Sequence, residues 1–195
     1  MADNLRDVFA QLRRGIRQRR YKVIADTAGI ETLDGFILDL GGGVASFFAA
    51  MFPEPSRVIL IDIDPKKALL ARKNHPKLHI VVGDAERLPF AGNSVRFSVS
   101  NSVIEHVNDP DAMASEVHRV SQGYFLQTPN GGFPIEPHSF IPIPFYNHIP
   151  IRAVKKFLCV LFGANFDYIS TVRYLSEQKL KSLFPEAILM YEKVL

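Results

Sequence analysis

The sequence FILDLGGG, residues 36–43, is a short apolar run that contains one aspartate and ends in three glycines. An apolar run of this length bounded by glycine predicts a strand buried on both faces, followed by a tight turn. A helix of small and apolar residues is expected next, over about residues 45–52, because Pro53 and Pro55 close the segment. The stretch therefore predicts the first strand, turn and helix of an α/β domain.

The same pattern repeats along the chain. Helical segments alternate with four further apolar runs, at residues 57–62, 78–82, 96–100 and 123–128. The Asp-Pro pairs at 64–65 and 109–110 predict helix starts, with aspartate as the cap and proline at the first helical position. We therefore expect a mostly parallel sheet covered on both faces, which is a Rossmann-like three-layer α/β/α sandwich.

Composition and charge narrow the class of protein. The 195 residues are 47% hydrophobic and 22% charged, which suffices for a continuous core and excludes a disordered chain. No apolar run approaches the roughly 18 residues that a membrane-spanning helix needs. A single cysteine, Cys159, and an N-terminus without an apolar signal segment predict a reducing, cytoplasmic location.

Residues 6–22 form a basic amphipathic segment, with seven basic side chains against one acidic side chain and apolar residues at helical spacing. The net charge of +3 is too small to be a strong signal for nucleic acid. We expect the basic face to be solvated. The alternative is that it contacts an anionic partner, such as a peripheral membrane surface.

The ends of the expected strands carry polar side chains. Asp39, Asp62 and Asp84 close the first three strands, and Asn101 follows the fourth. Ligands of parallel sheets bind at this edge. A pyrophosphate on the glycine turn would be repelled by Asp39, because no Lys or Arg lies between residues 38 and 56. The pattern favours a cationic adenosine ligand without phosphate, and S-adenosylmethionine has this chemistry.

In these stretches the chain resembles the class I S-adenosylmethionine-dependent methyltransferases, in their small-molecule, methyltransferase type 11-like branch. The similar segments are residues 37–43, 59–65, 83–90 and 100–107. The resemblance implies S-adenosylmethionine as the cofactor. It implies that Asp62 binds the ribose hydroxyls and that Asp84 binds the adenine amino group. The implied cofactor-binding residues are Asp39, Gly41, Gly43, Asp62, Ile63, Asp84, Ala85 and Asn101. Asp64, by contrast, is expected to be only a helix cap.

The segment 130–150 interrupts the α/β pattern with five prolines and four aromatic residues. A long irregular stretch inside a compact domain is typical of a functional loop, and in the resembling family this position covers the acceptor. We expect a substrate lid, with Glu136, His138, Phe145 and Tyr146 as substrate-side residues. His138 is the first candidate for a general base, His106 is the second, and Tyr146 is a candidate hydrogen-bond partner of the acceptor. No metal site is expected.

The end of the chain predicts a helix over 176–184 and a sixth strand over 187–195. The resembling family adds a final antiparallel strand; we expect it to be missing here, or supplied by a partner chain, which leaves a homodimer open. The expected organisation is one methyltransferase domain over residues 1–195. Its parts are a basic N-terminal helix region (1–30), a cofactor-binding core (36–129), a substrate lid (130–163) and a C-terminal helix and strand (164–195).

The function expected from these features is methyl transfer from S-adenosylmethionine to a small-molecule or lipid-like acceptor. Two alternatives stay open. One is a methyltransferase-like protein that binds without catalysis. The other is an NAD-dependent oxidoreductase, which Asp39 and Ser46 disfavour, since Ser46 stands where the dinucleotide fingerprint has its third glycine.

Overall fold

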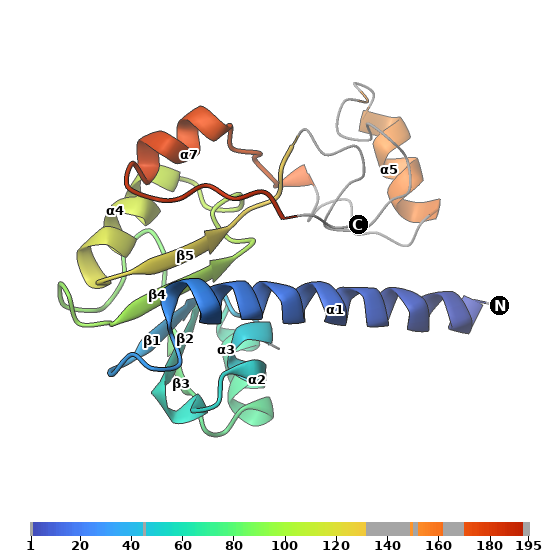
Figure 1. The fold of residues 1–195 in the computed structure, drawn as a ribbon. Helices are drawn as coiled ribbons and strands as arrows, with labels where there is room; N and C mark the ends of the chain where they lie inside the picture. The colour runs from blue at the N-terminus through green and yellow to red at the C-terminus, as the bar shows by residue number, and fades with distance from the viewer. Residues whose placement is uncertain (1, 45, 132–148, 150–151, 162–169, 193–195) are drawn as a thin grey trace.

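The computed structural model describes residues 2–44, 46–131, 149, 152–161 and 170–192. At its centre is a five-stranded sheet in the order β3-β2-β1-β4-β5, and every pairing is parallel (Figure 1). The strands are β1 (Ile37–Leu40), β2 (Val58–Asp62), β3 (His79–Val82), β4 (Phe97–Asn101) and β5 (Tyr124–Gln127). The predicted strands are confirmed to within about two residues at each end.

The helices are α1 (Ala2–Ala28), α2 (Phe47–Met51), the 3-10 turn η1 (Pro55–Arg57), α3 (Pro65–Asn74), α4 (Pro110–Val120), α5 (Arg152–Leu161) and α7 (Glu177–Leu183). The predicted caps are confirmed, because the side chains of Asp64 and Asp109 accept hydrogen bonds from the first backbone amides of α3 and α4. None of the described helices is both long and apolar enough to cross a membrane.

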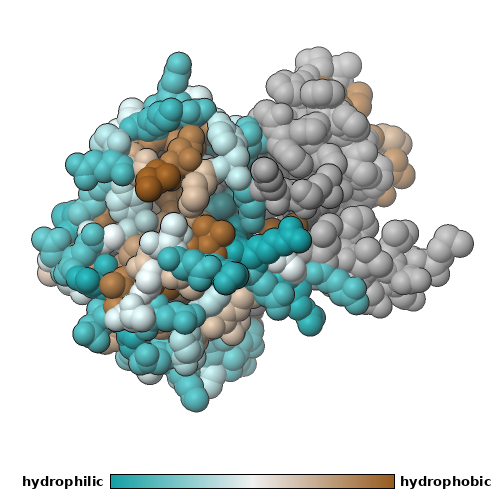
Figure 2. Space-filling view, viewed as in Figure 1, coloured by the Kyte–Doolittle hydropathy of each residue, from teal (hydrophilic) through white to brown (hydrophobic). Residues whose placement is uncertain are grey.

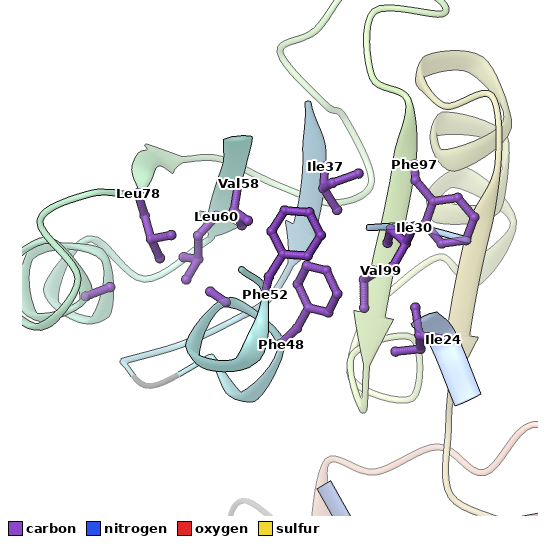
Figure 3. Close-up of a cluster of buried hydrophobic side chains, with 12 residues drawn as sticks. Ile24, Ile30, Ile37, Phe48, Phe52, Val58, Leu60, Leu78, Phe97 and Val99 are labelled. Carbon is purple, nitrogen blue, oxygen red and sulfur yellow. The ribbon is translucent and has the colours of Figure 1, made fainter. Parts of the chain in front are cut away.

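One face of the sheet is covered by α1, α2 and α3. Its core contains Ile37, Val58 and Val99 from the strands. Phe48 of α2 and Phe52, which directly follows that helix, stack there at a ring distance of 5.4 Å (Figure 3). Ile24 of α1 enters the same cluster, so the C-terminal half of this long helix is anchored in the core. The N-terminal half projects beyond the sheet (Figure 1).

The opposite face is covered by α4 and α7. Leu38, Leu40 and Ile61 of the strands pack there against Met113 of α4 and Phe184 after α7. Alternate residues of β1 thus face opposite cores, which explains the continuous apolar run of this strand. Helices on both faces of a parallel sheet confirm the predicted three-layer α/β/α architecture.

The predicted sixth strand is wrong over the described residues 187–192, which make no strand. Ala187 bonds back to Phe184 in a turn (N···O 3.1 Å), and the side chains from Ile188 to Tyr191 are all exposed. A half-buried strand needs one face against a core. This segment has no such face, and side-chain contacts of Tyr191 and Glu192 hold it instead.

Truncation of the fully buried Phe48 tests the first core. Phe48→Ala should lower the free energy of unfolding by about 3–5 kcal/mol, because it leaves a cavity between Phe52 and Tyr21. Leu69→Ala, on the exposed side of α3, should stay within about 0.5 kcal/mol of the parent. Urea unfolding followed by circular dichroism measures both, and equal effects would contradict the packing described.

Candidate functional site

The candidate site lies where the chain order of the strands reverses. From β1 the chain proceeds to β2 and β3 on one side, whereas β4 and β5 lie on the other side. At such a switch point the loops after neighbouring strands diverge and leave room for a ligand at the carboxyl edge. The glycine turn, residues 41–43, follows β1 directly and therefore occupies this position.

The turn requires glycine for two different reasons. Gly41 and Gly43 have φ angles of +63° and +61°, a conformation that other residues rarely adopt. Gly42 has ordinary φ, but a Cβ atom there would lie 2.6 Å from Asp39 Oδ2 and 2.8 Å from Leu60 Cδ1. The backbone of the turn therefore passes directly over the carboxyl group of Asp39.

Asp39 is buried beneath this turn. Its Oδ2 accepts a hydrogen bond from Ser46 Oγ, and Ser46 Oγ in turn accepts one from Ala49 N at 2.9 Å, which caps α2. Burial raises the pKa of Asp39 to about 7; the Ser46 hydrogen bond opposes this rise and the negative charge of Asp62 adds to it. Ser46, which departs from the dinucleotide fingerprint, thus has a structural role that favours the buried carboxylate.

Asp62, at the end of β2, is the second buried carboxylate of the site. Its two oxygens accept backbone hydrogen bonds, Oδ2 from Gly43 N at 3.1 Å and Oδ1 from Asp64 N at 2.9 Å. Asp62 therefore connects the glycine turn to the loop after β2. Asp39 lies against Gly42 and Asp62 binds the amide of Gly43, so the two carboxyl groups contact neighbouring residues of the same turn.

The loop after β3 contributes Asp84, whose Oδ1 accepts a hydrogen bond from Glu86 N at 2.9 Å. Ala85 beside it is half-buried. Ile63, directly after Asp62, is 67% exposed, and Val82, paired in register with Asp62, is 53% exposed. Two exposed branched side chains at the same edge offer an apolar surface for a flat ring. Sequence reasoning named Ile63 but missed Val82.

Asn101 is the last residue of β4, and the loop that follows holds Glu105 and His106. The side-chain oxygen of Asn101 accepts a hydrogen bond from Arg20 of α1, so this predicted cofactor-binding side chain is already engaged. Glu105 is fully buried, and its Oε2 accepts from Thr128 Oγ1 at 3.0 Å. His106 is half-buried, and its Nδ1 lies 3.2 Å from Thr171 Oγ1.

The substrate-side residues of the expected lid are not placed by the structure. Glu136, His138, Phe145 and Tyr146 lie outside the described residues. Their roles stay predictions, as do the cofactor-binding roles of the residues at the sheet edge. Among the described residues, no three His, Cys, Asp or Glu side chains come close enough together to hold a metal ion.

Two hollows, with volumes of about 350 and 510 Å³, lie at the opposite, amino edge of the sheet and share the lining residues Thr32, Asp34, Gly35 and Phe36. They contain none of the predicted site residues. Ligands of open parallel sheets bind at the carboxyl edge, and the buried carboxylates and the glycine turn lie there. We therefore place the candidate site at the carboxyl edge.

The raised pKa of Asp39 predicts a specific pH dependence of stability. The folded chain keeps this proton up to about pH 7, whereas an ordinary aspartate loses it near 3.8. Between about pH 4 and pH 7 the folded state therefore binds more protons than the unfolded state does. The contribution of Asp39 to the free energy of unfolding consequently falls as the pH rises from about 4 to about 7. Asp39→Asn should remove this fall. The free energy of unfolding of the variant, relative to that of the parent, should therefore increase progressively as the pH rises to 7. Urea unfolding at pH 5, 6, 7 and 8 tests this, and parallel curves for the two proteins would contradict it.

Comparisons with known proteins agree with this geometry. The methyltransferase domain family matches residues 38–126. The biotin biosynthesis bifunctional protein BioHC of Cellvibrio japonicus is 38% identical over 85 residues, which are 43% of this chain and 17% of that protein. The demethylmenaquinone methyltransferase of Chlorobaculum tepidum is 27% identical over 150 residues, which are 74% of this chain and 56% of that protein.

Among solved structures, a SAM-dependent methyltransferase of Thermotoga maritima has the same fold, with a TM-score of 0.56 and 18% identity over 95% of this chain and 76% of that one. The chain spans less than two thirds of the length of either curated relative. The matched region coincides with the sheet and the loops that form the candidate site. Residues 38–126 thus match the methyltransferase domain family, and the fold of the chain is that of a solved S-adenosylmethionine-dependent methyltransferase.

Proposed function

We propose that this chain transfers the methyl group of S-adenosylmethionine to a small-molecule or lipid-like acceptor. The observation that carries the proposal is the pair of buried carboxylates, Asp39 and Asp62, around a glycine turn at the switch point of the sheet. A cation or a pair of hydroxyl groups is stabilised by such carboxylates, whereas a phosphate is repelled. The residues present therefore fit the cofactor.

The parts of the site suit the parts of this cofactor. Asp62 is the acceptor that we propose for the ribose hydroxyls, and Asp84 is the one for the adenine amino group, beside the apolar surface of Ile63 and Val82. The bound cofactor supplies a methyl group activated by its sulfonium charge. The chain has to align the acceptor with that methyl group and exclude water, which accounts for much of the rate in such displacements. For a hydroxyl acceptor, His106 and His138 remain the candidate bases.

Calorimetry of the full chain tests the cofactor part. S-adenosylmethionine and S-adenosylhomocysteine should bind and NAD should not. Asp62→Asn should lower the affinity for both of these ligands by about tenfold or more, because a charge-assisted hydrogen bond is lost. Asp64→Asn is the matched control, since asparagine caps a helix as well as aspartate does, and it should leave binding unchanged.

Binding of NAD alone would overturn the proposal in favour of an oxidoreductase. Binding of S-adenosylmethionine without transfer of a labelled methyl group to a lipid extract, a naphthoquinol or a panel of small phenols would favour the non-catalytic alternative.

The lipid-like class of acceptor is favoured by α5. Its exposed apolar side chains recur at intervals of three and four residues, which places them on one side of the helix, while Cys159 on the other side is buried. They are Val154, Phe157, Val160 and Leu161, exposed by 39, 65, 73 and 63%. In Figure 2, hydrophobic surface appears where α5 lies.

Basic residues accompany this apolar side. Arg152 and Lys156 of α5 are exposed, as are Arg17 and Lys22 of α1. An amphipathic helix with an exposed apolar side and basic flanks is typical of segments that lie in a membrane interface. One relative is named for demethylmenaquinone, an apolar acceptor. We propose that α5 and the basic helix α1 contact an anionic membrane surface from which the acceptor is taken.

Vesicle sedimentation tests this membrane contact. The chain should bind vesicles of phosphatidylcholine with phosphatidylglycerol, and binding should weaken with salt. The double variant Phe157→Ser, Val160→Ser should bind about tenfold more weakly, because it removes buried apolar area in the interface. Leu69→Ser, an equally exposed apolar position on α3, is the control and should bind normally. Equal binding of the double variant and the parent would contradict the role of α5.

A further inference from the structure

One basic side chain reaches the carboxyl edge of the sheet from a distant part of the chain. Arg20 of α1 donates through Nη1 to the side-chain oxygens of Asn101 and Gln127, the latter at 3.4 Å. Asn101 and Gln127 are the last residues of β4 and β5 and are paired in register. Through Nη2, Arg20 forms an ion pair with Glu192 near the end of the described chain.

This guanidinium lies beside the candidate site. β4 is the neighbour of β1, with Leu40 in register with Ser100, so the loops after these two strands form the two sides of the switch point. The glycine turn belongs to the β1 side and Arg20 to the β4 side. The helix is held firmly there, because the ring of Tyr21 packs against Phe48 at 5.9 Å and Ile24 is fully buried.

The charge of Arg20 is opposite to that of the acidic residues of the edge, Asp39, Asp62 and Asp84. Its side chain is only 14% exposed, and within the described residues its Nε is buried and has no hydrogen-bond partner. Buried donors of this kind are normally satisfied. A guanidinium presents paired donors that match the two oxygens of a carboxylate. An unused buried donor beside a ligand site therefore points to a ligand group that satisfies it.

A carboxylate already pairs with Arg20 in this structure, and it comes from the chain itself. Glu192 belongs to the segment 187–192, which makes no strand and has exposed side chains. The side chain of Glu192 is 33% exposed, and an ion pair of that kind contributes little stability. The contact can therefore be exchanged for another carboxylate at small cost.

We infer that Arg20 is the carboxylate-binding group of the site and that Glu192 occupies it until a ligand carboxylate replaces it. The ligand carboxylate has two sources, the methionine part of the cofactor or the acceptor. Both sources rest on the proposed function. Either source makes Arg20 a specificity-determining residue and Glu192 an internal competitor.

Calorimetry of the full chain separates the two sources. In the first arm, S-adenosylhomocysteine, which has the carboxylate, is compared with 5′-methylthioadenosine, which lacks it. If the cofactor is the source, Arg20→Gln lowers the affinity for S-adenosylhomocysteine by about tenfold to a hundredfold and leaves the affinity for methylthioadenosine unchanged. In the second arm, octanoate is titrated into chain saturated with S-adenosylhomocysteine. If the acceptor is the source, octanoate binds the parent and not Arg20→Gln.

Two further variants complete the experiment. Arg72→Gln removes an exposed positive charge from α3 and should leave the affinity for both ligands unchanged. Glu192→Gln removes the internal competitor. It should raise the affinity for the ligand that Arg20→Gln weakens by about twofold to tenfold. It also keeps the inference testable if Arg20→Gln does not fold, which a thermal melt checks.

The role of Arg20 is overturned if S-adenosylhomocysteine and octanoate each behave identically with the parent and with Arg20→Gln. The role of Glu192 is overturned if Glu192→Gln leaves the affinity for that ligand unchanged or lowers it. Failure of the parent to bind methylthioadenosine and S-adenosylhomocysteine alike would instead count against the cofactor site, so the two kinds of failure are distinguishable.

Discussion

The close passage of the Gly42 backbone over the carboxyl group of Asp39 is the constraint on which the site depends. Asp39 Oδ2 and Leu60 fill the space that any other side chain at position 42 would need. The buried carboxyl group is tolerated because Ser46 donates to it, and the same hydroxyl begins α2. The next glycine amide binds Asp62. Two strands, a helix and the turn are thus joined through two buried acids, Asp39 and Asp62.

The long helix α1 combines two separate functions along its length. Its C-terminal half supplies Ile24 to the core and Tyr21 to the aromatic contacts with α2, so this part belongs to the fold. Its N-terminal half projects from the sheet and belongs to the surface (Figure 1). Arg20 lies in this anchored half and its side chain reaches the strand ends, whereas the side chains of Arg17 and Lys22 on the same half are exposed to solvent.

Much of the fold was predictable because burial on both faces leaves a continuous apolar run, and because Asp64 and Asp109 cap helices through local contacts. The segment 187–192 was misjudged because an apolar stretch does not reveal whether a partner strand exists. The contact of Arg20 with Asn101 joins residues 81 positions apart, and no local pattern distinguishes Arg20 from its basic neighbours. The protonation of Asp39 depends on burial, which only the packed structure reveals.

The half-titrated state of Asp39 near neutral pH has a consequence for ligand capture. If S-adenosylmethionine binds here as proposed, its sulfonium or ammonium group favours the ionised form of this carboxyl group, and its binding releases a proton into the solvent. By linkage, affinity for the cofactor declines in mildly acidic surroundings and recovers in alkaline ones. The buried acid beneath the glycine turn thereby makes the affinity for the proposed cofactor depend on pH.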